Sequence, residues 1–165
     1  MRIIFLDIDG VLNTEDTEDR CGYYIGIEDA KVELLKQIVD ATGAKIVLSS
    51  TWRLGIDNRG HRLEGHIPYL KEKLGKYGLE VFDKTEQLSK YGDLRGKEIH
   101  EWLSRHPDVD GWVVLDDEFF WDFNDYDIPR HRVQTWFYTS RGEGGLTEKN
   151  VEQAIKILKG EFDYE

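Results

Sequence analysis

Short apolar runs alternate along this chain with longer segments in which apolar residues recur at every third or fourth position. The short runs predict buried strands, and the helical spacing predicts amphipathic helices. Strands are expected at residues 2–7, 44–48, 79–82, 112–115 and 132–138. Helices are expected at residues 28–42, 68–77 and 95–105, and a last one between an N-cap at Thr147 and a stop at Gly160.

The alternation of strand and helix predicts the fold class. It favours a five-stranded, mainly parallel sheet with helices on both faces, a three-layer α/β arrangement of the Rossmann-like type. We expect one domain over residues 1–165. Between the regular elements, residues 11–27 predict a turn and a short hairpin, and residues 54–65 and 118–130 predict loops. In such open sheets, ligands bind beyond the carboxyl ends of the strands.

Composition and charge narrow the class of protein. The net charge of −11 argues against a protein that binds nucleic acid over its whole surface. A phosphate site in so acidic a chain needs a metal ion. The single cysteine, Cys21, excludes an internal disulfide and a cysteine metal cluster. No apolar run approaches about 18 residues and no signal-peptide pattern is present, so we expect a soluble cytoplasmic protein with no membrane partner.

Two carboxylates stand where the first strand is expected to end. Asp7 and Asp9 follow the apolar residues 3–6, and Gly10 then permits a sharp turn. Two acids in one small site repel each other, so the pair persists if a divalent cation neutralises it or if one acid keeps its proton. An isolated Asp-x-Asp-Gly is equally typical of a solvated turn. The other strand ends decide between these interpretations.

Those other strand ends also carry oxygen ligands. Two serines, at residues 49–50, follow the second strand, and Asp116 and Asp117 follow the fourth. In a parallel sheet these ends share one edge, so the side chains are expected to converge with Asp7. Mg²⁺ prefers oxygen ligands in octahedral geometry. We therefore predict a magnesium site formed by Asp7, one of the pair Asp116/Asp117 and a backbone carbonyl near Asp9.

Residues 5–12, Phe-Leu-Asp-Ile-Asp-Gly-Val-Leu, resemble the first motif of the haloacid dehalogenase (HAD) superfamily. The resemblance implies that Asp7 is a nucleophile and Asp9 a general acid/base, and that a two-stranded flap beside the site is the only cap. Residues 46–49, Ile-Val-Leu-Ser, and residues 113–117, Val-Val-Leu-Asp-Asp, are similar to the second and fourth motifs.

The second motif implies that the Ser49 hydroxyl binds a phosphoryl oxygen. Within the fourth motif we favour Asp117 as the direct metal ligand and Asp116 as its support, an order that could be reversed. Phosphate or substrate contacts are further expected at Gly10, Ser50 and Arg53, and Arg53 is equally suited to pair with an acid.

The third motif of the superfamily is a single Lys or Arg ahead of the fourth strand, and three residues qualify. We prefer Arg95, because Arg95-Gly96 opens a helix where a side chain can turn toward the strand ends. Lys97 is the second candidate and Lys84 the third.

Finer features resemble a smaller group within the superfamily. Residues 49–53, 95–99 and 145–147 look like compact HAD domains associated with RNA-repair-like proteins. The order of motifs is also similar to that of the phosphatase half of polynucleotide kinase-phosphatases. This resemblance implies a phosphorylated substrate that is a nucleotide or a nucleic-acid end.

The function predicted from these residues is Mg²⁺-dependent hydrolysis of a phosphomonoester through an aspartyl-phosphate on Asp7, with Asp9 moving the protons. A phospho-accepting receiver domain is the first alternative. It would need its acceptor after the third strand, where Asp83 lies, and a Lys after the fifth, where none matches. A non-catalytic binding module on the same fold is the second, and the intact acid pair argues against it.

Overall fold

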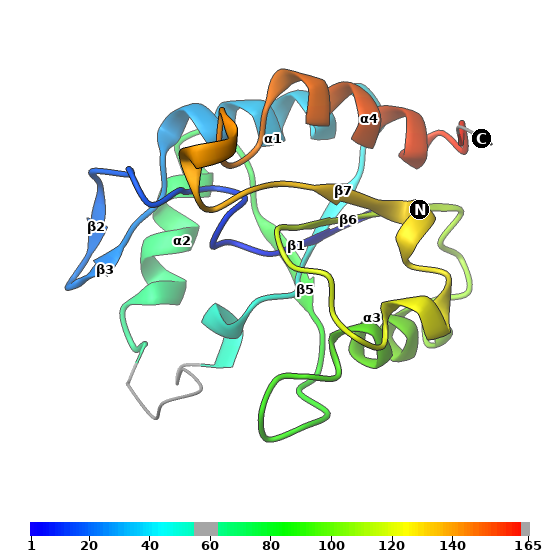
Figure 1. Cartoon of the computed structure of the whole chain (residues 1–165). Helices are drawn as coiled ribbons and strands as arrows, with labels where there is room; N and C mark the ends of the chain where they lie inside the picture. Colours follow the sequence, from blue (N-terminus) through cyan, green and yellow to red (C-terminus); the bar gives the residue numbers. More distant parts are fainter. Residues whose placement is uncertain (55–62, 163–165) are drawn as a thin grey trace.

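The sheet is parallel throughout and carries the fold. The computed structural model describes residues 1–54 and 63–162. Within them, five strands pair side by side in the order β5-β4-β1-β6-β7 (Figure 1). They are β1 (Arg2–Leu6), β4 (Lys45–Leu48), β5 (Val81–Lys84), β6 (Gly111–Asp116) and β7 (Arg132–Gln134). Four helices connect or follow them: α1 (Asp29–Thr42), α2 (His66–Gly75), α3 (Arg95–Ser104) and α4 (Glu148–Leu158). The predicted Rossmann-like α/β class is therefore confirmed.

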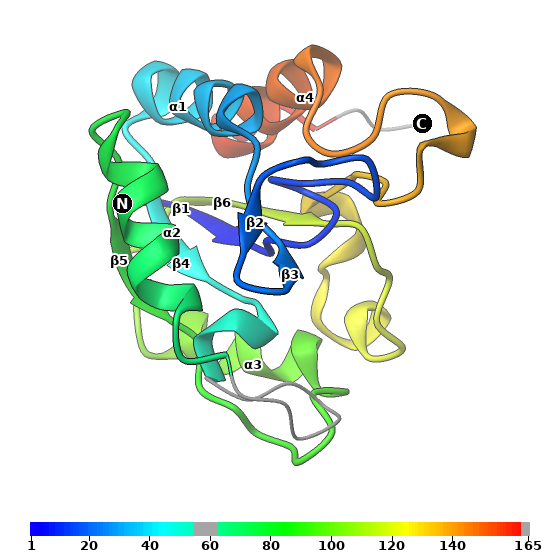
Figure 2. The same ribbon diagram turned by 90° about the vertical axis from the view of Figure 1, so that its left-hand side faces the viewer.

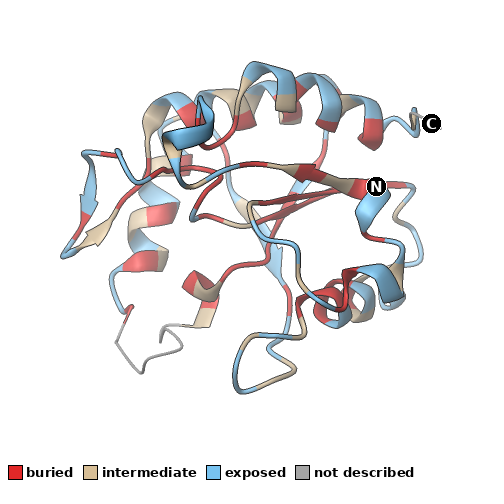
Figure 3. Ribbon diagram, viewed as in Figure 1, coloured by how far each residue is buried: buried red, intermediate tan, exposed pale blue. Residues whose placement is uncertain are grey.

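Helices cover both faces of the sheet because its central strands are apolar on both sides. In β1, Ile4 and Leu6 belong to a core shared with α1, α2 and α4, whereas Ile3 and Phe5 belong to a second core with α3. Figure 1 shows α1 and α4 above the sheet and α3 below it. Side chains of a strand alternate between its faces, so a run without polar residues must be covered twice. Figure 3 shows the resulting buried centre.

A small hairpin follows β1, as the sequence predicts. Strands β2 (Arg20–Cys21) and β3 (Tyr24–Ile25) pair antiparallel, with Cys21 opposite Tyr24. Figure 2 shows this hairpin in front of the sheet. The hairpin lies where the resemblance implies a two-stranded flap.

Two strands and one helix differ from their predicted limits by two residues or more. The third strand begins at Val81 because Leu79 still belongs to the turn after α2, where its N–H donates to the Leu74 carbonyl. The fifth strand ends at Gln134 because the next backbone groups bond to loops instead. The N–H groups of Glu15 and Gly145 donate to the carbonyls of residues 137 and 136.

Helix α2 starts at His66, two residues before its expected start at Pro68. Pro68 therefore lies in the first turn, where a backbone N–H has no partner within the helix and proline is tolerated. Of the loop expected at residues 54–65, residues 55–62 lie outside the described part of the chain. Among the described helices, none combines the length and hydropathy required to cross a bilayer.

Candidate active site

Three carboxylates meet where β1 and β6 end. Leu6, the last residue of β1, pairs in register with Leu48 of β4 and Leu115 of β6, so the residues that follow these strands lie at one level. Asp7 is held there by its N–H, which donates to the Leu115 carbonyl at 3.0 Å. Carboxylate oxygens of Asp7, Asp116 and Asp117 all lie within 4.8 Å of one another. We call these three residues the acidic cluster.

The acidic cluster cannot hold three negative charges on its own. Burial, followed by the charge of Asp116, raises the pKa of Asp7 well above its usual range. Burial is also the largest cause that raises the pKa of Asp116 to about 7 and that of Asp117 to about 7. A divalent cation would remove this repulsion, and three converging carboxylates form the all-oxygen donor set that Mg²⁺ prefers. The chemistry of the cluster therefore fits a hard divalent metal.

A buried arginine at the start of α3, the helix below the sheet, faces the acidic cluster. Arg95 is the first residue of α3, and its Nη1 lies 3.5 Å from Asp116 Oδ2 and 3.9 Å from Asp7 Oδ1. The same nitrogen donates to the Ser49 carbonyl. Arg95 lowers the pKa values of Asp7 and Asp116, against the stronger effect of burial. Of the three candidates for this position, Arg95 is the one that reaches the acids.

The other two candidates make no such contact within the described residues. The side chains of Lys97 and Lys84 are exposed, and within the described part of the chain neither forms an ion pair with the acidic cluster. The structure thus does not place Lys97 where it could act on a phosphate, because a residue two positions after Arg95 faces another side of the helix.

Residues that follow β6 hold Arg95 in place, which the sequence did not reveal. The carboxylate of Asp122 accepts from the backbone N–H groups of Gly96 and Lys97, both at 2.9 Å. A Cβ on Gly96 would collide with Asp122, so this contact requires glycine. The Phe120 ring lies 4.7 Å from the Arg95 guanidinium carbon. The aromatic and acidic segment therefore fixes the start of α3 instead of forming only a loop.

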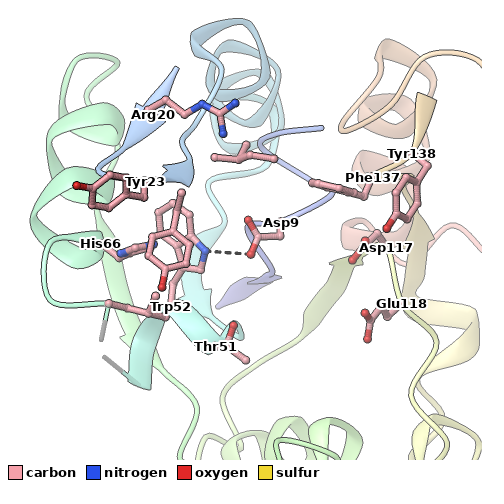
Figure 4. A pocket seen from close by; sticks show the side chains of 13 residues that line it. Asp9, Arg20, Tyr23, Thr51, Trp52, His66, Asp117, Glu118, Phe137 and Tyr138 are labelled. Atoms are coloured by element: carbon pink, nitrogen blue, oxygen red, sulfur yellow. Dashed lines mark hydrogen bonds between the residues drawn. The ribbon is translucent and has the colours of Figure 1, made fainter. Parts of the chain in front are cut away.

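Asp9 stands apart from the acidic cluster. Asn13 Nδ2 donates to Asp9 Oδ1 at 2.9 Å, and Trp52 Nε1 donates to Asp9 Oδ2 at 3.1 Å. The structure therefore does not place the Asp9 carboxylate among the clustered metal ligands. Both partners were missed from the sequence, since neither an Asn in a turn nor a Trp in the core carries a distinctive signal. They orient Asp9 toward the cavity shown in Figure 4.

Gly10 allows the turn after β1 to pack closely against Asp117. It has φ of +81°, and a Cβ there would collide with the carboxylate of Asp117. Its N–H donates to Asn13 Oδ1 at 2.9 Å. This bond occupies the Gly10 N–H, so the expected phosphate contact through that group is not formed. The glycine is required because Asp117 packs directly against the turn.

The two serines after β4 differ in their surroundings. The Ser49 hydroxyl is buried and has no hydrogen-bond partner among the residues that the structure describes, which is rare and costly for a polar group. An oxygen of a bound phosphate would satisfy it. Ser50 Oγ instead accepts from the Trp52 N–H at 3.2 Å, which leaves its hydroxyl proton unused by this bond, and the expected phosphate contact of Ser50 stays a prediction.

Arg53 is buried in the protein and does not face a substrate. Its Nε donates to the Thr85 carbonyl, its Nη1 to the Ser50 carbonyl, and its Nη2 pairs with Glu98 at 2.9 Å. The Arg53 and Glu98 side chains are 2% and 0% exposed. The expected substrate contact of Arg53 is therefore corrected to its alternative, a pair with an acid.

Replacing Glu98 with Gln is expected to lower the free energy of unfolding by about 3–5 kcal/mol, because the buried Arg53 charge loses its partner. Urea denaturation followed by circular dichroism measures this. Glu86→Gln is the matched control: its pair with Arg105 is exposed, so the urea midpoint should barely move. A Glu98→Gln midpoint equal to that of the wild type would contradict the structural role of the pair.

A cavity of about 580 Å³ opens beside the acidic cluster, with Asp9 and Asp117 in its lining. Figure 4 shows Tyr23, His66 and Trp52 on one side of Asp9, and Phe137 and Tyr138 on the other. A ligand bound at the cluster would therefore extend between two aromatic walls.

A parallel sheet with acids and a buried cation at the ends of its strands defines a HAD-type domain. The sequence family described as "HAD domain in Swiss Army Knife RNA repair proteins" matches residues 3–151, and the chain belongs to it. No curated protein matches the chain. Membership in this family supports a phosphatase-like hydrolase activity, and the acidic cluster could hold a divalent metal.

Proposed function

We propose that this protein is a Mg²⁺-dependent phosphomonoester hydrolase that works through an aspartyl-phosphate on Asp7. The observation that carries the proposal is the arrangement around the end of β1. Asp7 lies with Asp116 and Asp117 within 4.8 Å, and Arg95 faces two of them. A site that only bound a metal would not need the additional Asp9, which lines the same cavity as Asp117.

Each residue of the site has a separate task in this proposal. Mg²⁺ held by the acidic cluster would offset its charge and polarise the phosphoryl group. An oxygen of Asp7 attacks phosphorus while the bond to the leaving oxygen breaks, and that oxygen takes a proton from Asp9. The Asp9 carboxylate then accepts a proton from a water whose oxygen attacks phosphorus. The bond to Asp7 breaks, which releases inorganic phosphate and restores the enzyme.

The remaining groups hold the phosphoryl oxygens and the carboxylates. The unpartnered hydroxyl of Ser49 donates to a phosphoryl oxygen, where negative charge must be stabilised. Arg95 stays bound to the Ser49 carbonyl and between Asp7 and Asp116, so it sets the orientation of both acids. The description of the family favours a nucleotide or a nucleic-acid end as substrate.

A receiver-type role is less well supported. Its acceptor would be Asp83, but Asp83 Oδ2 accepts from Trp102 Nε1 at 2.9 Å, in the layer below the sheet. It is not part of the acidic cluster. A phosphoprotein that survived for minutes would favour the receiver over the phosphatase.

Replacing Asp9 with Asn is expected to slow hydrolysis of p-nitrophenyl phosphate by about 10²- to 10⁴-fold, because the leaving oxygen loses its proton donor. The affinity for Mg²⁺, measured by calorimetry, should stay close to that of the wild type because the Asp9 carboxylate lies outside the acidic cluster. Lost Mg²⁺ affinity together with an unchanged rate at saturating metal would contradict the assigned role. Wild-type protein that hydrolyses no phosphomonoester with Mg²⁺ would refute the function.

A further inference from the structure

The cavity beside the acidic cluster has two aromatic walls that come from distant parts of the chain. The first wall is an edge-to-face cluster in which the His66 ring lies between those of Tyr24 and Trp52, with centroid distances of 5.1 and 4.5 Å. Tyr23, at the tip of the β2–β3 hairpin, extends this wall and is fully exposed. The second wall is Phe137 with Tyr138, whose rings are 5.2 Å apart. Figure 4 shows the two walls facing each other across Asp9.

Both walls are anchored to the residues that flank the chemistry. Trp52 donates to Asp9, and Asn13 joins Asp9 to the hairpin through a bond to the Gly26 carbonyl at 2.8 Å. On the other side, the Phe137 carbonyl accepts from the Glu15 N–H at 3.0 Å. The walls are thus positioned around the group that would protonate the leaving oxygen. A leaving group attached to that oxygen would lie between the two walls.

The aromatic side chains of the lining favour a leaving group that carries a flat ring. Tyr138 is 66% exposed, so its ring offers a free face toward the cavity. Planar rings stack on such faces regardless of their substituents. Three carboxylates in the lining, Asp9, Asp117 and Glu118, oppose a second anion close to the acidic cluster. Among the described lining residues, Arg20 on the hairpin carries a positive charge. The cavity volume of about 580 Å³ lies in the range of small-molecule sites, about 300–1,000 Å³.

We propose that this cavity binds the base of a terminal nucleotide, stacked between the hairpin wall and Tyr138, with its phosphate at the acidic cluster. The proposal rests on the phosphatase function and adds to it the part of the substrate that is recognised. The terminal nucleotide can belong to a free mononucleotide or to a single-stranded end. In the second case, the next phosphate lies toward Arg20.

The test is a binding measurement that needs no turnover. Calorimetry with Mg²⁺ and Asp9→Asn protein, the slow variant expected to keep its Mg²⁺ affinity, compares adenosine 5′-monophosphate with ribose 5-phosphate, in which a hydroxyl replaces the base. The nucleotide should bind about 5- to 150-fold more tightly, the range for one stacked base. Adding Tyr138→Ala or Tyr23→Ala should collapse this ratio, and Tyr138→Phe should keep it. Tyr91→Ala is the matched control, since Tyr91 is also exposed but lies outside the cavity.

The outcomes separate this inference from the proposed function. Equal binding of the two ligands, or a ratio that neither tyrosine variant changes, would overturn the inference even if wild-type protein hydrolyses aryl phosphates. A base preference in a protein without phosphatase activity would retain the nucleotide site and refute the function. A 5′-phosphorylated single-stranded trinucleotide that binds more tightly than the mononucleotide, with the gain lost in Arg20→Ala, would identify a strand end. Equal binding of the two would identify the free nucleotide.

Discussion

Asp7→Asn protein is expected to lose hydrolysis of p-nitrophenyl phosphate by at least about 10³-fold in kcat, because an amide oxygen cannot replace the nucleophilic carboxylate. The substitution keeps the shape of the side chain and its backbone bond to Leu115. It also removes one of three mutually repelling carboxylates, whose burial raises the pKa of Asp7. The melting temperature should therefore stay equal to that of the wild type or rise, so the loss reports chemistry and not unfolding.

The control for this substitution is Asp40→Asn. Asp40 pairs with Lys36 on the exposed side of α1 and is not part of the acidic cluster. Its replacement should therefore leave kcat unchanged. The result that would contradict the assignment is an Asp7→Asn protein with full activity. Trapping of phosphate on wild-type but not on Asp7→Asn protein, detected by mass spectrometry after an acid quench, would support the covalent step.

Mg²⁺ is expected to stabilise the protein strongly at pH 8 and only weakly at pH 5.5. The pKa values of Asp116 and Asp117 are both raised to about 7 from an ordinary value of 3.8, mainly by burial. Below about pH 7 the folded protein keeps protons on these acids, and Mg²⁺ must displace them. Above that pH Asp116 and Asp117 are ionised and free to bind the metal. At a concentration 100 times Kd, binding adds about 2.7 kcal/mol to the free energy of unfolding.

Without Mg²⁺, the stability of the protein is expected to fall as the pH rises. Between about pH 4 and pH 7, folded Asp116 and Asp117 hold more protons than they do in the unfolded chain. The free energy of unfolding of the metal-free protein therefore falls as the pH rises through this interval. Mg²⁺ reverses the loss above pH 7.

Melting temperatures with EDTA or with Mg²⁺ at the two pH values measure both effects. For a chain of this length, a gain of about 2.7 kcal/mol corresponds to a shift of about 5–10 °C at pH 8. Asp117→Asn should remove most of the shift, because it deletes one of the three carboxylates. A shift of the same size at pH 5.5 and pH 8 would show that Mg²⁺ does not bind at these acids.

Sequence alone predicted that the polar residues after the first and fourth strands lie together. The apolar run before Asp7, the serines after the second strand and the acids after the fourth carried enough information, because parallel strands bring their carboxyl ends to one edge. The preference for Arg95 over Lys97 also agrees with the structure, in which Arg95 Nη1 lies 3.5 Å from Asp116 Oδ2. The sequence pattern was sufficient to place a residue wherever the fold class alone determines where that residue lies.

The errors arose where a side chain had a choice of partner. Arg53 follows the second strand as a phosphate-binding residue would, yet it pairs with Glu98 on α3. Spacing along the chain gives no sign of that contact, because the partner lies in another layer. The same holds for the Asp122 carboxylate on the start of α3.

What this sequence determined by itself is the order of strands and helices and the place where acids gather, since both follow from periodicity and from the geometry of a parallel sheet. Only the tertiary structure decided which cation faces the acids, how Asp9 is held by Asn13 and Trp52, and that two aromatic walls enclose the approach. The physical reason is that hydrogen bonds, ion pairs and ring contacts depend on distances between layers, and these distances are set by packing and not by position along the chain.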